Sequence, residues 1–192
     1  MSTERALIHP IVLVGGKSVR FGRDKLREPL SGPHEWLVDC SVRALREVFG
    51  ARVTLVGDCH PDVAARGDDH VADRYPAVGP GGGILTALEY TGGDVFVLAG
   101  DLPYVTASGV RAVLAAASAH ETDATDATAP LVVLAESNGV HPCFGLYRYA
   151  VRGALADRLQ IGRGSLYDLV PSTRRLLVPV TAVETTNLNT PD

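Results

Sequence analysis

A glycine-rich segment with two cations follows the first apolar run of the chain, and its composition suits a phosphate ligand. The run 11–14 (Ile-Val-Leu-Val) leads directly into Gly15 and Gly16, and Arg20 and Lys25 follow in the same segment. Glycines let backbone N–H groups turn toward a ligand without a Cβ in the way, which forms an anion-binding concavity. Arg20 and Lys25 add positive charge beside it. The segment predicts a site for a polyphosphate.

Two common phosphate-binding motifs do not match this segment. A Walker A loop requires glycine where this chain has Ile11, and the dinucleotide fingerprint Gly-x-Gly-x-x-Gly fails because Gly15 and Gly16 are adjacent and the next glycine is Gly22. The mismatch disfavours a P-loop ATPase and a dinucleotide-dependent oxidoreductase. From these residues alone, a simple Gly-Gly turn with solvated basic side chains stays open as the alternative.

A carboxylate follows another apolar run. Asp101 comes shortly after the run 95–99 (Val-Phe-Val-Leu-Ala), and Pro103 restricts the chain beyond it. A carboxylate at the carboxyl end of a buried strand is well placed to hold Mg²⁺, which takes one or two carboxylates together with phosphate oxygens. The alternative role for Asp101, capping the next helix, suits Thr106 better.

A second Pro/Gly cluster surrounds another aspartate. Asp73 precedes the segment 79–83 (Gly-Pro-Gly-Gly-Gly), which leads into a helical pattern. Amides and the dipole at a helix N-terminus favour an anion or a polar base edge. Taken alone, Asp73 is better explained as an aspartate in a surface turn. Asp58, after another apolar run, is a weaker candidate for a contact to a base or ribose.

Short apolar runs alternate with helical patterns along the whole chain. The predicted strands are 11–14, 53–56, 95–99, 131–134 and 176–178, and the predicted helices surround Val38–Phe49, Ile84–Leu88 and Val110–Leu114. This alternation predicts one α/β domain over residues 1–192, Rossmann-like, with a mostly parallel sheet and helices on both faces. Ligands of such sheets bind at the carboxyl ends of the strands near a topological switch point. The polar segment 118–130 is expected to be a solvated loop.

Composition narrows the class of protein further. The chain has 192 residues, 46% of them hydrophobic and 21% charged, with a net charge of −4. A pI near 5.8 gives no electrostatic footprint for nucleic acid. No apolar stretch is long enough for a membrane span or, near the N-terminus, for a signal peptide, so a cytoplasmic protein is expected. The three cysteines, Cys40, Cys59 and Cys143, are too widely spaced to suggest a disulfide framework or a metal site.

The first glycine segment resembles the signature of the MobA-like nucleotidyltransferases, Leu-x-Gly-Gly-x-Ser-x-Arg-x-Gly-x-Asp-Lys. All its specified positions match, as Leu13, Gly15, Gly16, Ser18, Arg20, Gly22, Asp24 and Lys25. Val14 stands where the family usually has alanine, and its larger side chain is expected to tighten the nucleotide pocket. The later segments occur in the family's order, so the resemblance covers nearly the whole chain.

The resemblance implies roles for individual residues. The nucleotide would be bound by Leu13, Val14, Gly15, Gly16, Lys25, Asp73 and Asp101, Mg²⁺ would be held by Asp101, and Arg20, Lys25 and Asp101 would act in catalysis. The segment 140–147, with His141 and Pro142, resembles the part of the family that lines the acceptor side, and 187–192 matches its closing Asn-x-Asn-Thr-Pro motif. Arg163 lies in a turn that could meet an acceptor phosphate. For His141 and Arg163, ordinary loop residues remain equally good interpretations.

Within this family, the Gly-Gly form and the Asn-Thr-Pro ending favour an enzyme that transfers GMP from GTP to the phosphate of molybdenum-bound molybdopterin, with release of pyrophosphate. The implied partners are GTP, a molybdopterin-type acceptor and other proteins of cofactor biosynthesis or molybdoenzymes, with no nucleic acid or membrane. The alternatives are a sister enzyme that uses CTP or another phosphorylated acceptor, and a nucleotide-binding regulator without turnover.

Overall fold

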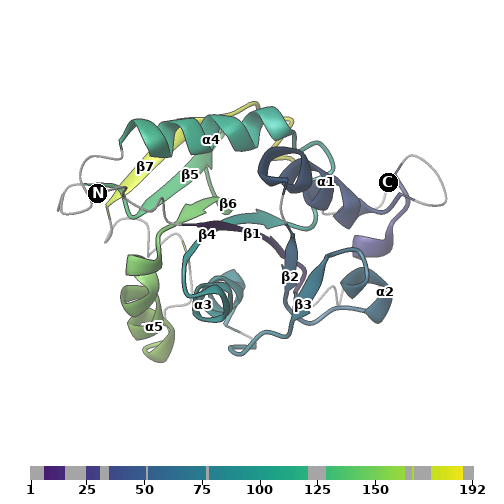
Figure 1. The fold of residues 1–192 in the computed structure, drawn as a ribbon, viewed down its shortest axis with the longest axis horizontal. Helices are drawn as coiled ribbons and strands as arrows, with labels where there is room; N and C mark the ends of the chain where they lie inside the picture. Colours follow the sequence, from purple (N-terminus) through teal and green to yellow (C-terminus); the bar gives the residue numbers. More distant parts are fainter. Residues whose placement is uncertain are drawn as a thin grey trace.

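A seven-stranded sheet lies at the centre of this computed structural model, and helices cover both of its faces (Figure 1). The structure describes residues 7–15, 25–30, 35–50, 52–76, 78–120, 129–162, 166 and 174–187. Its elements are, in chain order, β1 (Ile8–Leu13), the 3-10 helix η1 (Lys25–Arg27), α1 (Leu37–Phe49), β2 (Thr54–Val56), α2 (Pro61–Ala64), β3 (Asp69–Val71), α3 (Pro80–Thr91), β4 (Asp94–Ala99), α4 (Ala107–Ala119), β5 (Val132–Glu136), β6 (Val140–Tyr147), the 3-10 helix η2 (Tyr149–Val151), α5 (Arg152–Gln160) and β7 (Arg175–Pro179).

The sheet has the strand order β3-β2-β1-β4-β6-β5-β7. Among the described strands only β6 runs against its neighbours; the pairs β1–β2, β2–β3, β1–β4 and β5–β7 are all parallel. The chain builds outward from β1 to β2 and β3 on one side and returns to β4 on the other. The switch point predicted for the binding site therefore lies between β1 and β4.

Strand β1 is buried on both faces, as its continuous apolar run predicts. Val12 and Val14 pack into a cluster with side chains of α1 and α4. Ile11 and Leu13 pack into a second cluster with side chains of α3 and α5. Figure 1 shows these two helix pairs on opposite sides of the sheet. The predicted mostly parallel α/β fold with two covered faces is confirmed.

Helix α1 illustrates how the local sequence determines these elements. Its apolar side chains, including Val38, Val42 and Leu45, are buried against the sheet, while Arg46 faces solvent. The helix ends where Gly50 adopts the left-handed conformation, with φ of 55°. Helix α4 begins with the predicted cap, because the Thr106 hydroxyl accepts a hydrogen bond from the Gly109 amide at 3.1 Å.

The structure differs from the sequence-based expectations at the end of α4 and at the segment with His141. Ser118 and Ala119 belong to α4 rather than to a loop, because the alanines at 115–117 have high helix propensity and carry the helix further. Residues 121–128 of the expected loop lie outside the described residues. The segment with His141 is a strand, β6, which the sequence conceals because Pro142 and Gly145 are poor strand residues.

The three cysteines are free thiols; Cys40 is buried, and Cys59 and Cys143 are half-buried. None of the described helices is both long enough and apolar enough to cross a membrane.

Candidate nucleotide-binding and acceptor site

Lys25 and Asp101 meet at the switch point of the sheet. The Nζ atom of Lys25 donates a hydrogen bond to Oδ2 of Asp101 at 2.6 Å, although 76 positions separate them in the chain. Their side chains are only 22% and 17% exposed, so the pair is largely shielded from water. One residue assigned to phosphate binding and one assigned to metal binding thus lie in direct contact, the first a cation and the second a carboxylate.

The backbone around this pair is held by the two central strands. The amide of Gly100 donates to the carbonyl oxygen of Leu13 at 2.9 Å, which joins the ends of β4 and β1. Leu26, in η1, is buried, and a Cβ at Gly100 would lie 3.2 Å from its Cδ2 atom. This close packing of η1 on the turn after β4 brings Lys25 to Asp101.

The start of the glycine segment packs against the turn that follows β2. The amide of Val14 donates to the carbonyl oxygen of Val56 at 2.9 Å. The side chain of Val14 is 4% exposed and belongs to the hydrophobic cluster under α1 and α4. The expectation that its larger side chain tightens the nucleotide pocket is wrong, because the extra methyl groups lie in the core. Asp58, the weaker candidate, is exposed beside Gly15.

Gly57 is required for the backbone of this segment to come so close, and Gly57→Ala is expected to destabilise the protein by about 1 to 3 kcal/mol. Its φ is 129°, and an added Cβ would lie 2.8 Å from the Cα atom of Gly15, where only backbone could yield. The free energy of unfolding from urea titration measures the effect. Gly139→Ala is the control, because a Cβ there meets nothing within 4 Å. Equal stability of the two variants would contradict the prediction.

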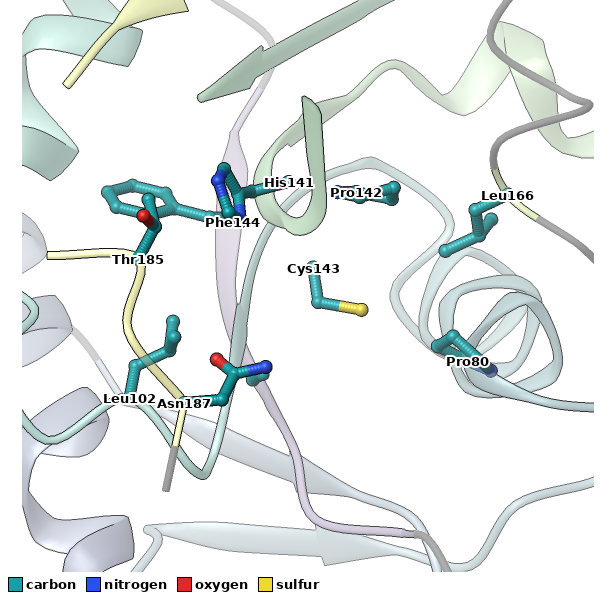
Figure 2. A pocket seen from close by; sticks show the side chains of 10 residues that line it. Pro80, Leu102, His141, Pro142, Cys143, Phe144, Leu166, Thr185 and Asn187 are labelled. Carbon is teal, nitrogen blue, oxygen red and sulfur yellow. The ribbon is translucent and has the colours of Figure 1, made fainter. Parts of the chain in front are cut away.

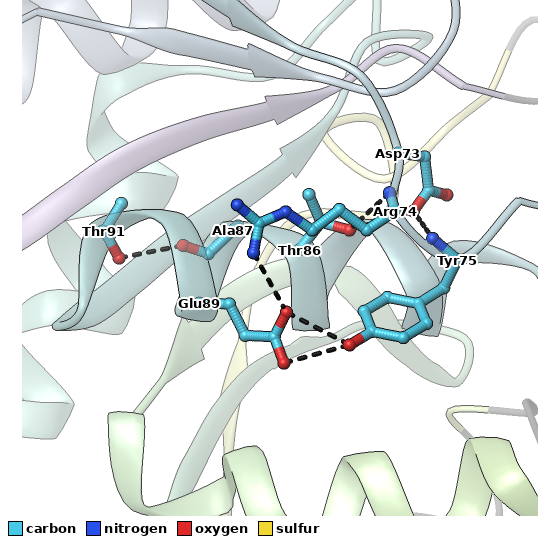
Figure 3. Close-up of polar contacts among 7 residues, drawn as sticks. All are labelled: Asp73, Arg74, Tyr75, Thr86, Ala87, Glu89 and Thr91. Atoms are coloured by element: carbon cyan, nitrogen blue, oxygen red, sulfur yellow. Dashed lines mark hydrogen bonds and ion pairs between the residues drawn. The ribbon is translucent and has the colours of Figure 1, made fainter.

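Asp73 is held in one orientation at the N-terminal side of α3 (Figure 3). Its Oδ1 atom accepts hydrogen bonds from the Tyr75 amide at 2.9 Å and from the Thr86 hydroxyl at 3.0 Å. The Thr86 hydroxyl, in turn, accepts from the Arg74 amide at 3.1 Å. Thr86 is completely buried, so this anchor is shielded from water. Because both bonds fall on Oδ1, the arrangement directs the carboxylate rather than leaving it free in a turn.

The loop between Asp73 and α3 is fastened at its other side by Tyr75. The Tyr75 hydroxyl donates to the Glu89 carboxylate, with distances of 3.0 and 3.1 Å to its two oxygens. Burial, and then the hydrogen bond to Glu89, raise the pKa of Tyr75, so the hydroxyl stays protonated. A Cβ at Gly82 would lie 2.5 Å from the Tyr75 carbonyl oxygen, so glycine is needed where α3 meets this loop.

A cavity of about 370 Å³ opens beside the switch point (Figure 2). Its lining comes from the end of β4 and the turn after it, the start of α3, β6, one residue between α5 and β7, and the segment after β7: Pro80, Ala99, Leu102, His141, Pro142, Cys143, Phe144, Leu166, Thr185 and Asn187. The segment assigned to the acceptor side, with His141 and Pro142, and Asn187, the first residue of the closing motif, therefore border the same cavity. Most of the wall is apolar, and its polar groups come from His141, Thr185 and Asn187.

A bulge in β6 shapes this cavity. Between the adjacent β5 residues Leu134 and Ala135, the partner in β6 changes from Gly145 to His141, so residues 142–144 have no partner in β5. The fully buried Tyr147 donates its hydroxyl to the carbonyl oxygen of Pro142 at 2.6 Å and anchors the bulge. Bulges re-aim side chains near functional sites, and all three unpaired residues line the cavity.

Cys143 projects into this cavity but is not activated as a nucleophile (Figure 2). Burial, together with the negative charge of Asp101, raises the pKa of the Cys143 thiol to about 12. A nucleophilic cysteine needs the opposite shift, because the thiolate is the reactive form. Cys143 therefore acts as a protonated, weakly polar part of the wall near Asp101.

The structure leaves part of the assigned site undescribed. Gly16, Arg20, Arg163 and the residues after Asn187 lie outside the described residues. Sequence reasoning also missed residues that the structure places at the site. Thr86 orients Asp73, while Thr185 lines the cavity. No local motif marks them, because each acquires its position through contacts with distant segments.

The sequence is similar to those of known proteins. The model of the family described as "MobA-like NTP transferase domain" matches residues 10–176. A protein from Chloroflexus aggregans, named "Probable molybdenum cofactor guanylyltransferase", is 30% identical over an alignment of 195 positions that covers 95% of this chain and 89% of that protein. One of the same name from Opitutus terrae is 34% identical over 112 residues, but this match spans only 56% of the chain and 54% of the relative.

The fold was compared with solved structures. A crystal structure of a protein from Aquifex aeolicus superposes with a TM-score of 0.75 and covers 96% of this chain and 95% of its own. The two sequences are 24% identical, so this likeness concerns the fold alone.

Proposed function

This chain belongs to the MobA-like NTP transferase family, and on that premise we propose that it transfers GMP from GTP to the phosphate of molybdenum-bound molybdopterin and releases pyrophosphate. The observation that carries this proposal is the Lys25–Asp101 pair at the adjoining ends of β1 and β4, next to a largely apolar cavity. The names of the relatives from C. aggregans and O. terrae support the choice of nucleotide and acceptor.

Nucleotidyl transfer requires positioning and charge stabilisation more than covalent help from the protein. The acceptor phosphate attacks the α-phosphorus of GTP while pyrophosphate departs on the opposite side. Lys25 would hold phosphate oxygens of the departing group and offset their negative charge. The backbone of Gly15 and Gly16 and the side chain of Arg20 would bind the same phosphates. Asp73, oriented by Thr86, would contact the nucleoside part.

Asp101 is suited to hold a divalent cation that is shared with the nucleotide. Its Oδ2 atom binds Lys25, and within the described part of the chain Oδ1 has no hydrogen bond. No group of three potential metal-ligating side chains gathers among the described residues. A single carboxylate that leaves the other positions to phosphate oxygens and water is a donor set that Mg²⁺ accepts. When bound, the cation would neutralise charge on the phosphates.

The nucleotide and the acceptor can be identified by pyrophosphate release. We expect release with GTP, dependent on both Mg²⁺ and molybdenum-loaded molybdopterin, and little release with CTP or ATP. The assay runs each nucleotide with and without acceptor, and with EDTA in place of the metal.

Three other outcomes would contradict the proposal in different ways. A preference for CTP would assign the chain to a sister activity, and turnover only with another phosphorylated acceptor would change the substrate. Tight GTP binding without acceptor-dependent release would indicate a regulator. If the proposal holds, the product passes to molybdoenzymes or to other proteins of cofactor biosynthesis.

A further inference from the structure

Two polar residues of the cavity wall, Thr185 and His141, are linked through Ser137 by a continuous series of hydrogen bonds. Thr185 donates its hydroxyl proton to the carbonyl oxygen of Ala182 at 3.0 Å. The oxygen of Ser137 lies 2.8 Å from the Thr185 hydroxyl oxygen and 2.8 Å from Nε2 of His141. These hydrogen bonds therefore link the segment after β7, the turn between β5 and β6, and the histidine in the cavity wall.

When all three of these hydrogen bonds are made at once, counting protons gives the direction of each bond. A hydroxyl group has one proton, and a carbonyl oxygen can only accept. Since Thr185 gives its proton to Ala182, Ser137 must donate to Thr185. Ser137 then has no proton left for His141 and must accept from it. Nε2 of His141 consequently carries the ring proton.

The other ring nitrogen of His141 is left as an acceptor. Burial lowers the pKa of His141, so the ring is neutral at neutral pH. A neutral imidazole with its proton on Nε2 has a lone pair on Nδ1. Nδ1 has no hydrogen-bond partner among the described residues, and His141 lines the cavity (Figure 2).

We propose that Ser137 and Thr185 are positioning residues that keep the proton of His141 on Nε2, so that Nδ1 accepts a hydrogen bond from a donor group of the ligand in this cavity. The inference about the ligand rests on the proposed function, whereas the inference about the proton does not. The surrounding wall of Leu102, Pro142 and Phe144 is apolar. A flat heterocycle with an N–H group on its edge would fit both. Its ring would pack on the apolar wall, and its N–H group would donate to Nδ1 of His141.

The position of the proton is measured directly by two-bond ¹H–¹⁵N correlation spectra of the ¹⁵N-labelled protein at about pH 8, well above the ordinary histidine pKa of about 6.5. Protonated and unprotonated ring nitrogens resonate far apart, and the His141→Gln spectrum identifies the signals of His141. The wild-type protein is expected to show a protonated Nε2 and an unprotonated Nδ1. A protonated Nδ1 in the wild type would overturn the proposal without any variant.

Thr185→Val tests the role of this series of hydrogen bonds. Valine has the same shape but no hydroxyl, so Ser137 regains a proton that it can donate to Nε2 of His141. We expect the form with Nδ1 protonated to become at least several-fold more populated, while Thr185→Ser retains the wild-type spectrum. Ser137→Ala, which removes the acceptor altogether, is the second variant. Unchanged His141 signals in both Thr185→Val and Ser137→Ala would overturn the positioning role.

A kinetic measurement tests the link to the ligand. Thr185→Val is expected to raise the KM for the molybdopterin acceptor by roughly 2- to 12-fold, the equivalent of one net hydrogen bond, with little change in the KM for GTP and rescue by Thr185→Ser. A shifted proton with an unchanged acceptor KM would overturn the recognition role. Wild-type protein that releases no pyrophosphate with any acceptor would refute the proposed function instead, and the spectra would still decide the state of His141.

Discussion

Asp101→Asn is expected to lower acceptor-dependent pyrophosphate release by about 10²- to 10³-fold, the usual effect of removing one electrostatic contact to charge that develops in a transition state. Asparagine keeps the shape of the side chain but removes the charge that Lys25 and a divalent cation require. Lys25→Ala, which removes the cation at 2.6 Å from the same carboxylate, is expected to cause a loss of the same order. Initial rates at saturating GTP, acceptor and Mg²⁺ measure both effects.

The matched control for this pair is Arg27→Ala. Arg27 lies in the same short helix as Lys25, but it pairs with the exposed Asp62 at 3.1 Å and stacks over Trp36. Its removal should leave the rate close to that of the wild type. Thermal unfolding of each variant separates loss of the site from loss of the fold. Near-wild-type turnover in both Asp101→Asn and Lys25→Ala would refute the roles assigned to these two residues.

The largest expected loss of stability follows from a substitution at the opposite end of β4. Asp94 accepts hydrogen bonds from Arg148 at 2.8 Å and from the Tyr149 amide at 2.8 Å. The side chains of this ion pair are only 10% and 17% exposed. Asp94→Ala removes from a largely buried position both the charge that pairs with Arg148 and the acceptor of the Tyr149 amide, so it is expected to lower the free energy of unfolding by about 3 to 5 kcal/mol, as measured by urea denaturation.

The control for Asp94 is an ion pair of similar length on the surface. Glu47 and Arg111 lie 3.0 Å apart, but their side chains are 59% and 54% exposed. Water already solvates both charges, so Glu47→Ala is expected to cost less than about 1 kcal/mol. If the two substitutions lower the free energy of unfolding by the same amount, burial does not explain the contribution of the Asp94 pair to stability.

The elements that were predicted correctly are those with a strong local pattern. The continuous apolar runs of β1, β4 and β5 predict strands that are buried on both faces. The apolar side chains of α1 recur at helical spacing and predict an amphipathic helix. Strand β3, by contrast, was not predicted, because its three residues Asp69, His70 and Val71 carry no alternating pattern. Strand β6 was missed because Pro142 and Gly145 lie inside it, where only its neighbours β4 and β5 compensate for them.

The residues of the candidate site also fall into two groups, those that short motifs predict and those whose position depends on the fold. Gly15, Lys25, Asp73 and Asp101 were assigned to the candidate site from short motifs, because contacts to phosphates and cations require particular residue types at particular spacings. The orienting bond from Thr86 to Asp73 was not foreseen, since it depends on how α3 packs beside the preceding loop.

By itself, the sequence determined the α/β alternation, the family resemblance and the residue types at the phosphate and cation site, because these depend on neighbours along the chain. Only the tertiary structure decided that Lys25 lies against Asp101 and that Val14 faces the core. It also placed Nε2 of His141 at 2.8 Å from the Ser137 hydroxyl oxygen. The physical reason is that hydrogen bonds and ion pairs act over about 3 Å, a distance that folding creates between segments far apart in the chain.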